Sequence, residues 1–554
     1  MSRQHVLSFR EAHANIKARG APHAWRDVVD DFGGEVWPEF HPSFRIRPGE
    51  VIFTMGSCFA RNIETHLAML GCVVPMMDFD LPPTEWGGGV HGAMNRFHPP
   101  AFRQTLQWVG GIYDRDGQVV WDDCAVYAFP CGDELYLDLD MGSAAPVTHA
   151  RFVERRQHVY DIFSQAFSAA CLMMTPGLIE AWRDRETGFY LHNAPKHRAM
   201  LRNPDRWEFE VLPYDACRDA MLAAIDCVRA RNPGVKVLLT TSPVPLSATF
   251  TTDDIRIANM HSKSVLRAVC GEARLSRPDV DYFPSYESVM LSFPKGLWKT
   301  DRLHVSQGFI AKIVSRMLDQ YLDGVDAADR ECQRARMHLL SGQVADGEAC
   351  ARAALELRPG DVDARRFLAE ALSRQERGDE AKAELKALIQ DNPGQPEPWL
   401  ALARAQARDS EPRETLASIE AALTLPGVAL LDVLSALKGV APCDDQPTLE
   451  RIGRRVVELF PLHAESYQPL VDALVEARRL DEAREVLELA VTRRRSTAHM
   501  HVLLAKLLGK QGRLDKARDQ LQLALNKEPD SAKAKDLMQR FSGRQLELAA
   551  AAAT

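Results

Sequence analysis

Two short stretches of the sequence carry residues that could perform nucleophilic chemistry. The first is Gly56-Ser57-Cys58, between the apolar run 51–55 and an amphipathic stretch at 60–70. At a helix start, unpaired N–H groups and the helix dipole stabilise anions, so we expect a thiolate at Cys58 with a lowered pKa. The same N–H groups could bind an oxyanion. Considered alone, however, the stretch is more typical of a serine that caps a helix and a buried cysteine.

The second stretch is Asp301-x-x-His304, in a loop just before the last helix expected in the first half of the chain. A histidine base needs a partner that fixes its tautomer and stabilises its cation, and an aspartate does this in hydrolytic triads. Either stretch is common by itself, but their combination is not. Together they favour acyl chemistry with Cys58 or Ser57 as the nucleophile, His304 as the base and Asp301 as its partner.

The elements that must position these residues alternate between β and α patterns. Alternation of this kind predicts a parallel, doubly wound α/β sheet, in which ligands bind at the carboxyl ends of the strands. Ser57 and Cys58 follow the first strand and therefore lie at that edge. The strands are expected at 51–55, 71–75, 170–177, 235–243 and 280–285, and the helices at 60–70, 151–169, 214–231, 252–273 and from Val305 onward.

The second half of the chain repeats with a period of about 34 residues. A small alanine at one position of the repeat lets two antiparallel helices approach closely, and a proline ends the second helix. One proline is missing from the array, and Arg495 stands in its place. The recurring residues are Pro359, Pro393, Pro426, Pro461 and Pro529, together with Ala381, Ala483 and Ala517.

This half resembles the tetratricopeptide family over residues 327–540, with six units, of which those around 407–416 and 426–447 depart from the pattern. Such an array forms either a concave groove for a protein partner or a spacer or dimerisation arm, and the sequence favours neither. We therefore expect a domain at 1–325 with its core at about 40–323, an all-α solenoid at 327–545, and a tail at 546–554.

The first half resembles the bacterial GSCFA family, which lies in the neighbourhood of the SGNH (GDSL-like) hydrolase superfamily. The motif that names the family is intact as Gly56-Ser57-Cys58-Phe59-Ala60. The resemblance covers about residues 40–323, and it implies a flavodoxin-like sheet. It extends through the strings "NRFHPPAF", "TPGLIEAWRD", "TTSPVPL", "YFPSYE" and "DRLHVS".

The resemblance also implies roles for single residues. Cys58 falls on the superfamily's nucleophilic serine, Ser57 on its preceding aspartate and Gly56 on its glycine. Asp301 and His304 fall on its catalytic aspartate and histidine. Cys58 is therefore the expected nucleophile, and Ser57 is the second candidate.

One block of the superfamily pattern is incomplete. The best match to its G-x-N-D block is Gly177-Leu178-Ile179-Glu180, which lacks the asparagine that donates to the oxyanion. Asn95, or a backbone N–H near Gly88 and Gly89, is a candidate replacement. The expected oxyanion and substrate-binding residues are therefore Gly56, Gly88, Gly89, Asn95, Gly177 and Glu180.

The function that follows is acyl-ester chemistry on a small molecule or a glycan such as a polysaccharide. Water as the acceptor makes the protein an esterase, and a sugar hydroxyl makes it an O-acyltransferase. A thiol suits transfer from thioesters, so acyl-CoA is a candidate donor, although no bound cofactor is expected. The alternative is a non-catalytic SGNH-like module that binds a glycan or protein, with the repeats as adaptor. The missing asparagine supports that alternative, and the intact D-x-x-H opposes it.

Composition excludes several other classes. The 554 residues carry a formal net charge of -8, which argues against a nucleic-acid partner. No apolar run reaches the ~20 residues that span a bilayer, and the N-terminus does not read as a signal peptide. The eleven cysteines are scattered without a CxxC pair, and His91 and His98 lack a third ligand, so we expect no metal site and a reducing, cytoplasmic location.

Overall fold

The computed structural model describes most of the chain, which divides into two compact units. The first comprises residues 1–81 and 89–367, and the second comprises 82–88 and 368–554. The expected tail at 546–554 lies outside the described residues, and the expected domain boundary at residue 325 stays a prediction. The described residues are 7–18, 34–82, 85–86, 90–111, 127–141, 144–293, 296–438, 440, 445–492, 497–528 and 531–541.

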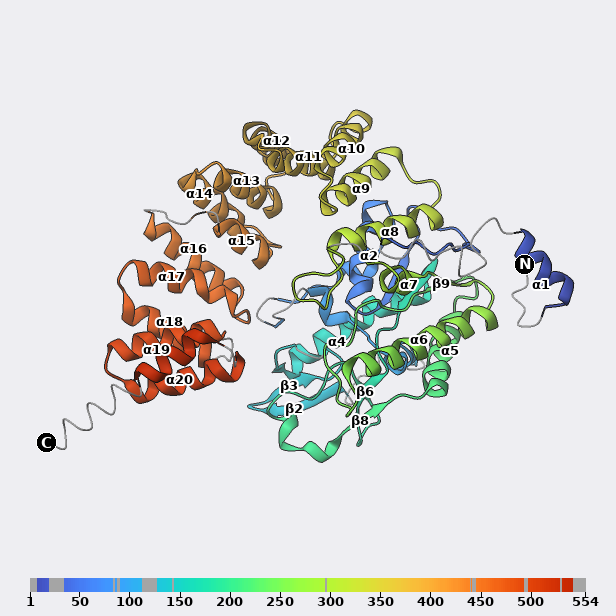
Figure 1. Cartoon of the computed structure of the whole chain (residues 1–554), viewed down its shortest axis with the longest axis horizontal. Coiled ribbons are helices and arrows are strands. Elements are labelled where there is room, and N and C mark those ends of the chain that lie inside the picture. Colours follow the sequence, from blue (N-terminus) through green and yellow to red (C-terminus); the bar gives the residue numbers. More distant parts are fainter. Residues whose placement is uncertain are drawn as a thin grey trace. The chain divides into compact units, whose positions relative to one another are not determined.

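A four-stranded parallel sheet forms the centre of the first unit, in the order β1-β5-β9-β10. Of these strands, β9 is labelled in Figure 1. The strand predicted at 71–75 is reduced to one parallel bridge between Val51 and Val73, which lies beside β1. The resulting order is that of a flavodoxin-like sheet, as expected. The strands are β1 (Ile52–Gly56), β5 (Cys171–Thr175), β9 (Lys236–Leu239) and β10 (Val280–Tyr282).

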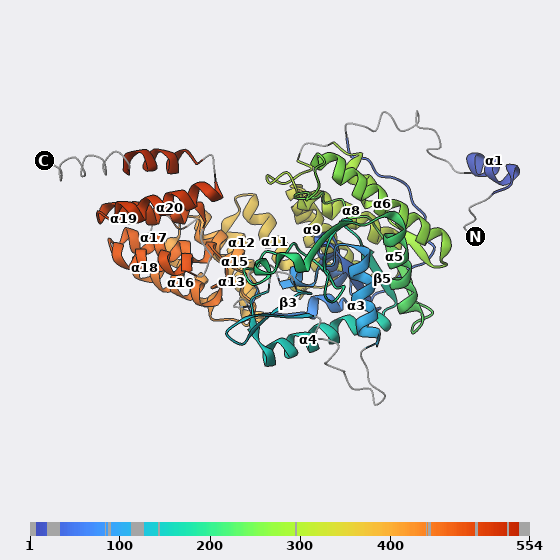
Figure 2. The same ribbon diagram turned by 90° about the horizontal axis from the view of Figure 1, so that it is seen from below.

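Helices cover both faces of this sheet, which explains why its strands are continuous apolar runs. On one face, α2 (Cys58–Met69) and α8 (Gln307–Tyr321) share a core with alternate strand residues such as Ile52 and Met173. On the other face, Phe53 of β1 packs against Phe163 of α4 (His149–Ser164), with ring centroids 5.6 Å apart. Figure 2 shows α8 and α4 on opposite sides of β5.

The remaining helices of this unit complete the α/β alternation. The α5 helix packs against both α3 and α6, and α6 also contacts β10. The helices predicted at 151–169, 214–231 and 252–273 correspond to α4, α5 and α6, with ends that differ by a few residues. The bounds are α1 (Phe9–Ala18), α3 (Pro99–Gly111), α5 (Tyr214–Arg229), α6 (Ile255–Ser276) and α7 (Ser285–Met290).

Two small antiparallel sheets were not expected from the sequence. One has the order β2-β3-β4, and the other has the order β7-β6-β8. The second sheet contributes a wall to the pocket described below. The strands are β2 (Ala128–Gly132), β3 (Leu135–Asp138), β4 (Val147–Thr148), β6 (Glu180–Asp184), β7 (Tyr190–Leu191) and β8 (Trp207–Val211).

The repeat region is all helical, as predicted. Ala381, Ala483 and Ala517, the small residues of the repeat, are each fully buried. The second of the irregular units expected in its middle, at 426–447, contains α15, which has only 8 residues. The α9 and α10 helices belong to the first compact unit and α12 to α20 to the second, whereas α11 crosses the division. The helices are α9 (Ala327–Leu340), α10 (Val344–Leu357), α11 (Val362–Arg374), α12 (Gly378–Asp391), α13 (Pro396–Arg408), α14 (Pro412–Leu423), α15 (Leu430–Leu437), α16 (Gln446–Leu459), α17 (Gln468–Glu476), α18 (Leu480–Thr492), α19 (Ala498–Lys510) and α20 (Leu514–Lys527).

Candidate active site

The turn after β1 depends on Gly56. Its φ is +155°, and a Cβ atom built there would lie 2.6 Å from the carbonyl oxygen of Thr175. The next N–H group, that of Ser57, donates to the same carbonyl at 3.1 Å. Because no side chain fits at Gly56, the β1–α2 turn can lie directly against the end of β5. Gly56 thus shapes the turn through its backbone, and it does not line the pocket that is described below.

Ser57 and Cys58 have different environments. Ser57 is the N-cap of α2 and is 3% exposed; its Oγ accepts from the Phe59 N–H at 3.3 Å and donates to Ser242 Oγ at 2.9 Å. Cys58 is the first residue of α2, is partly exposed, and lines a pocket. Both residues line the pocket described below, but the Ser57 hydroxyl is engaged in two hydrogen bonds within the protein and is the more buried of the two. This contrast favours Cys58, although the nucleophile's identity stays a prediction.

The expected lowering of the Cys58 pKa is wrong. Burial raises the pKa of the thiol above its usual value, because the thiolate loses solvation. The charge of Lys263, the N–H groups of Cys58 and Phe59, and the charge of Lys299 act in the opposite direction without reversing it. The helix start favours the thiolate, as reasoned from the sequence, but desolvation has the larger effect on the pKa of Cys58. A nucleophilic role for Cys58 would therefore require a base that takes the proton from this thiol.

Lys263 of α6 is a charged group that we did not single out from the sequence. It is fully buried, and its Nζ donates to the carbonyl oxygens of Gly177 at 2.5 Å and Val244 at 2.6 Å. It thereby ties the loop after β5 to the loop after β9. Burial lowers its pKa to about 7, and the charge of Cys58 opposes that shift. The only signal in the sequence is that Lys263 falls on the apolar stripe of α6, three residues before the buried Leu266.

Asp301 and His304 form the expected pair. One Asp301 oxygen lies 2.8 Å from His304 Nδ1, and the other accepts the N–H groups of Leu303 and His304 at 2.9 Å. These three bonds hold the pKa of Asp301 well below its usual range. The ionised carboxylate makes Nδ1 the donor, so His304 Nε2 carries the lone pair. His304 lines the same pocket as Cys58.

The pocket has a volume of about 540 Å³ and lies at the carboxyl edge of the parallel sheet. Its walls include five residues singled out from the sequence, which are Ser57, Cys58, Gly177, Glu180 and His304. Asp301 does not line the pocket itself, but it contacts His304, which does. Gly88 and Gly89 lie outside the described residues.

Gly177, Glu180 and Asn95, the other described candidates for oxyanion or substrate binding, either bind other groups of the protein or do not line the pocket. The N–H groups of Gly177 and Leu178 both donate to the Phe97 carbonyl, at 2.7 and 3.2 Å. Glu180 accepts from Thr249 Oγ1 at 2.6 Å and from the Phe250 N–H at 3.1 Å, so it holds a loop. Asn95 is not among the walls of the pocket. The roles of these residues stay predictions.

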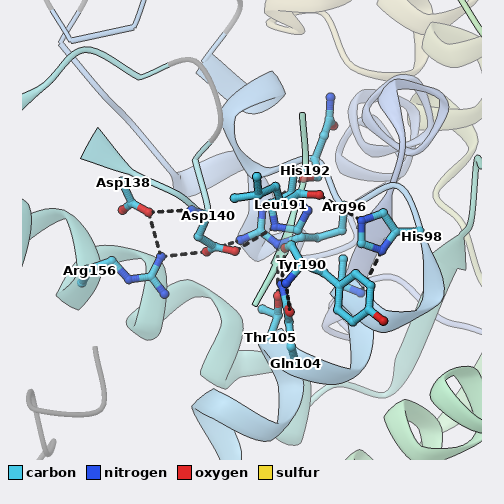
Figure 3. Close-up of polar contacts among 12 residues, drawn as sticks. Arg96, His98, Gln104, Thr105, Asp138, Asp140, Arg156, Tyr190, Leu191 and His192 are labelled. Carbon is cyan, nitrogen blue, oxygen red and sulfur yellow. Dashed lines mark hydrogen bonds and ion pairs between the residues drawn. The ribbon is translucent and has the colours of Figure 1, made fainter. Parts of the chain in front are cut away.

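A buried polar network, which includes the pocket residue His192, was missed from the sequence (Figure 3). Asp140 accepts from Arg96 at 2.6 Å, from Arg156 at 2.7 Å and from His192 Nε2 at 2.8 Å. The two guanidinium groups and His192 hold the pKa of Asp140 well below its usual range despite burial, which by itself would raise it. Asp138 lies 3.6 Å from Arg156. Only His192 of this network is a wall of the pocket.

His98, the second buried histidine in the pocket wall, has both ring nitrogens engaged. Nε2 lies 3.0 Å from the Leu191 carbonyl, and Nδ1 accepts from the Ala101 N–H at 3.2 Å. Burial lowers the pKa of His98 to about 3, so it is neutral at physiological pH. Within the described residues, no group of three His, Cys, Asp or Glu side chains could hold a metal ion.

The fold defines an α/β unit with a parallel sheet, followed by helical repeats. Residues 51–317 match the model of the GSCFA family, and residues 338–405 and 474–541 match a model of the tetratricopeptide repeat. The protein therefore contains a GSCFA family domain followed by a tetratricopeptide array, as the sequence predicted. The gap between the two repeat matches, residues 406–473, contains the irregular middle units. No curated protein matches the chain.

Solved structures of tetratricopeptide proteins are among those that resemble this chain. The Cut9-Hcn1 hetero-tetramer of APC/C matches at 16% identity over 43% of this chain, with a TM-score of 0.29. That match spans less than half of the other chain, namely 46% of it. PilF of Pseudomonas aeruginosa matches at 16% identity over 39% of this chain and 97% of its own, with a TM-score of 0.30. A thermophilic tetratricopeptide protein of Thermus thermophilus matches at 20% identity over 40% of this chain and 100% of its own, with a TM-score of 0.20.

No helix in the described ranges is both long enough and apolar enough to cross a membrane.

Proposed function

We propose that the GSCFA domain catalyses acyl-ester chemistry, as an esterase or an O-acyltransferase, with Cys58 as the nucleophile. One observation carries this proposal. Cys58 and His304 line the same pocket, and Asp301 binds His304 Nδ1 at 2.8 Å, which leaves Nε2 as the proton acceptor. A nucleophile, a base and a group that orients the base are the parts that acyl transfer needs.

The reaction begins when His304 Nε2 takes the Sγ proton of Cys58 as the sulfur attacks the carbonyl carbon of the ester. The tetrahedral oxyanion faces the N–H group at the start of α2. Its collapse breaks the C–O bond, and His304 returns the proton to the leaving oxygen. A thioester on Cys58 remains. Water or a sugar hydroxyl then gives its proton to His304 and attacks that thioester, which restores the thiol.

The raised pKa of Cys58 shapes this mechanism. Because burial keeps the sulfur protonated, the thiolate forms only as His304 takes the proton. Lys263, in its protonated form, is the positive charge that favours the anion when it forms. No cofactor is needed for these steps, and acyl-CoA is a candidate donor in the transferase case. The repeat array, in this proposal, binds a protein partner.

Intact mass spectrometry of the full chain after incubation with p-nitrophenyl acetate or acetyl-CoA tests the proposal. We expect an acetyl adduct on Cys58, absent in Cys58→Ala and retained in Ser57→Ala. An adduct that persists in Cys58→Ala and disappears in Ser57→Ala would move the role to Ser57.

The same experiment separates an enzyme from the non-catalytic binding module, which the occupied N–H groups of Gly177 and Leu178 favour. A binding module forms no adduct and releases no p-nitrophenol above the buffer rate. Parent protein that behaves in this way, with normal thermal melts, would refute the proposed chemistry.

A further inference from the structure

Three aromatic rings form one surface in the wall of the pocket that also holds Cys58. Between ring centroids, Trp182 of β6 lies 5.4 Å from Phe209 of β8, and Phe250 lies 5.2 Å from Trp182 and 5.5 Å from Phe209. All three residues line the pocket. Trp182 and Phe209 are partly exposed, and Phe250 is 56% exposed. A ligand can therefore reach these rings, and covering them with an apolar group is favourable.

Other apolar side chains extend this surface. Leu303 lies next to His304 in the chain, so the apolar wall includes the neighbour of the proposed base. The pocket volume of about 540 Å³ is in the range that holds drug-sized ligands, and it far exceeds the space that an acetyl group fills. An apolar surface that solvent can reach commonly marks a binding site. Apart from alanines and the three rings, the apolar wall residues that are partly exposed are Phe97, Leu178, Val244, Pro245 and Leu303.

Several polar side chains of the wall already bind other groups of the protein. Ser57 Oγ donates to Ser242 Oγ at 2.9 Å, and both ring nitrogens of His98 are engaged. Glu180 accepts from Thr249 Oγ1 at 2.6 Å. A sugar ring placed among these walls would bury hydroxyl groups with few free partners, whereas an apolar chain needs none. The polar wall residues that are exposed are Asn193, Lys196 and Ser247.

We propose that the pocket binds an apolar acyl group longer than acetyl, with its chain against Trp182, Phe209 and Phe250. The inference rests on the proposed function, because it names the class of acyl group that the same site transfers or releases. The carbonyl carbon then lies at Cys58, and the polar remainder of the ester is left to the exposed polar wall residues. Phe250 is a specificity-determining residue in this arrangement, since it contacts the acyl chain and not the reacting atoms.

Calorimetric titration of the full-length protein with the N-methyl amides of butanoic, hexanoic and octanoic acid tests this inference. These amides carry the carbonyl and the chain of an acyl ester but a poor leaving group, so they report binding whether or not the protein turns over esters. Each added CH₂ group that becomes buried should lower Kd by about fourfold. We therefore expect the octanoyl amide to bind the parent most tightly of the three.

The outcomes separate this inference from the proposed function. No binding of the octanoyl amide, or a Kd that does not fall with chain length, would overturn the inference and leave the acyl chemistry at Cys58 untouched. Methyl glucoside that binds more tightly than the octanoyl amide would assign the pocket to a sugar and would also overturn it. Conversely, amide binding that follows chain length in a protein that forms no acyl adduct would refute only the proposed function.

Phe250→Ala shows whether the acyl chain binds in this pocket. Its ring is mostly exposed, so the variant should melt near the parent temperature, and it should bind the octanoyl amide about tenfold more weakly because the chain loses one wall. Phe293→Ala is the matched control, since Phe293 is 66% exposed and does not line the pocket. It should bind as the parent does. Parent-like binding by Phe250→Ala, or equal losses in the two variants, would overturn the assignment.

Discussion

Replacing Lys263 by methionine tests whether a positive charge is buried beneath the pocket. Burial lowers the pKa of Lys263 from 10.5 to about 7, and the residue is fully buried, so solvent does not screen the effect. One pKa unit corresponds to about 1.4 kcal/mol, so the depression represents about 5 kcal/mol of unfavourable charge burial at low pH. Lys263→Met removes this cost together with two hydrogen bonds to carbonyl groups.

The sign of the pH dependence follows from the direction of the shift. Between pH 7 and 10.5 the unfolded chain binds a proton at Lys263 that the folded chain releases. The free energy of unfolding of the parent therefore rises with pH in this window. From about pH 7 to 9 the contribution of Lys263 is about 2 kcal/mol. Lys263→Met lacks it, so any stability advantage of the variant at neutral pH should shrink by about that amount at the upper end of this range.

Urea unfolding at about pH 7, 8 and 9, followed by tryptophan fluorescence, measures this difference. All tryptophans except Trp399 precede residue 325, so the signal reports mainly on the first part of the chain. Lys312→Met is the control, because Lys312 is partly exposed and pairs with Glu35 at 2.6 Å. Parallel pH profiles for the parent and Lys263→Met would refute the buried charge, whatever the absolute stabilities.

Two further substitutions test the loop and the turn that carry the site. His304→Ala should lower kcat/KM for a simple ester by about 100-fold or more, and Asp301→Asn by the same amount or less; turnover that survives in His304→Ala would contradict the triad. Gly56→Ala should lower the free energy of unfolding by about 3 kcal/mol, because the new Cβ would meet the Thr175 carbonyl. Gly111→Ala is the control, since that residue has open space around it, and it should change the free energy of unfolding by about 0.5 kcal/mol or less. Equal urea midpoints for the two variants would show that β1 and β5 do not approach closely at Gly56.

The central sheet was predictable because its signal is local. The run 51–55 and the string "CLMMT" at β5 are apolar at nearly every position, which is typical of a strand covered on both faces. The strand expected at 71–75 was overestimated, since it lies at the sheet edge and forms a single bridge next to β1. A short apolar run shows that a segment is buried, but not how many of its backbone groups have a partner strand.

The two antiparallel sheets and the polar network were not predictable in this way. The β6 strand pairs with β8, from Glu180 with Val211 to Asp184 with Trp207, and neither strand carries a continuous apolar run. Asp140 and His192 meet although 52 positions separate them in the chain. Asp301 and His304 could be recognised because three positions is a spacing at which side chains meet within one loop. Contacts formed by distant segments leave no such pattern.

Two histidines of the pocket wall, His192 and His304, each pair with an aspartate behind them, and the surroundings of the two pairs differ. A proton added to His192 would stand beside Asp140 but also near Arg96 and Arg156, so the network would gain a net positive charge in a buried site. A proton added to His304 would face Asp301, which has no arginine or lysine within ion-pair distance among the described residues, at a half-exposed position. Burial and the neighbouring arginines hold the pKa of His192 low, at about 4, whereas His304 lies beside an ionised carboxylate in the pocket wall. Under the proposed function, proton transfer therefore belongs to His304 rather than to His192.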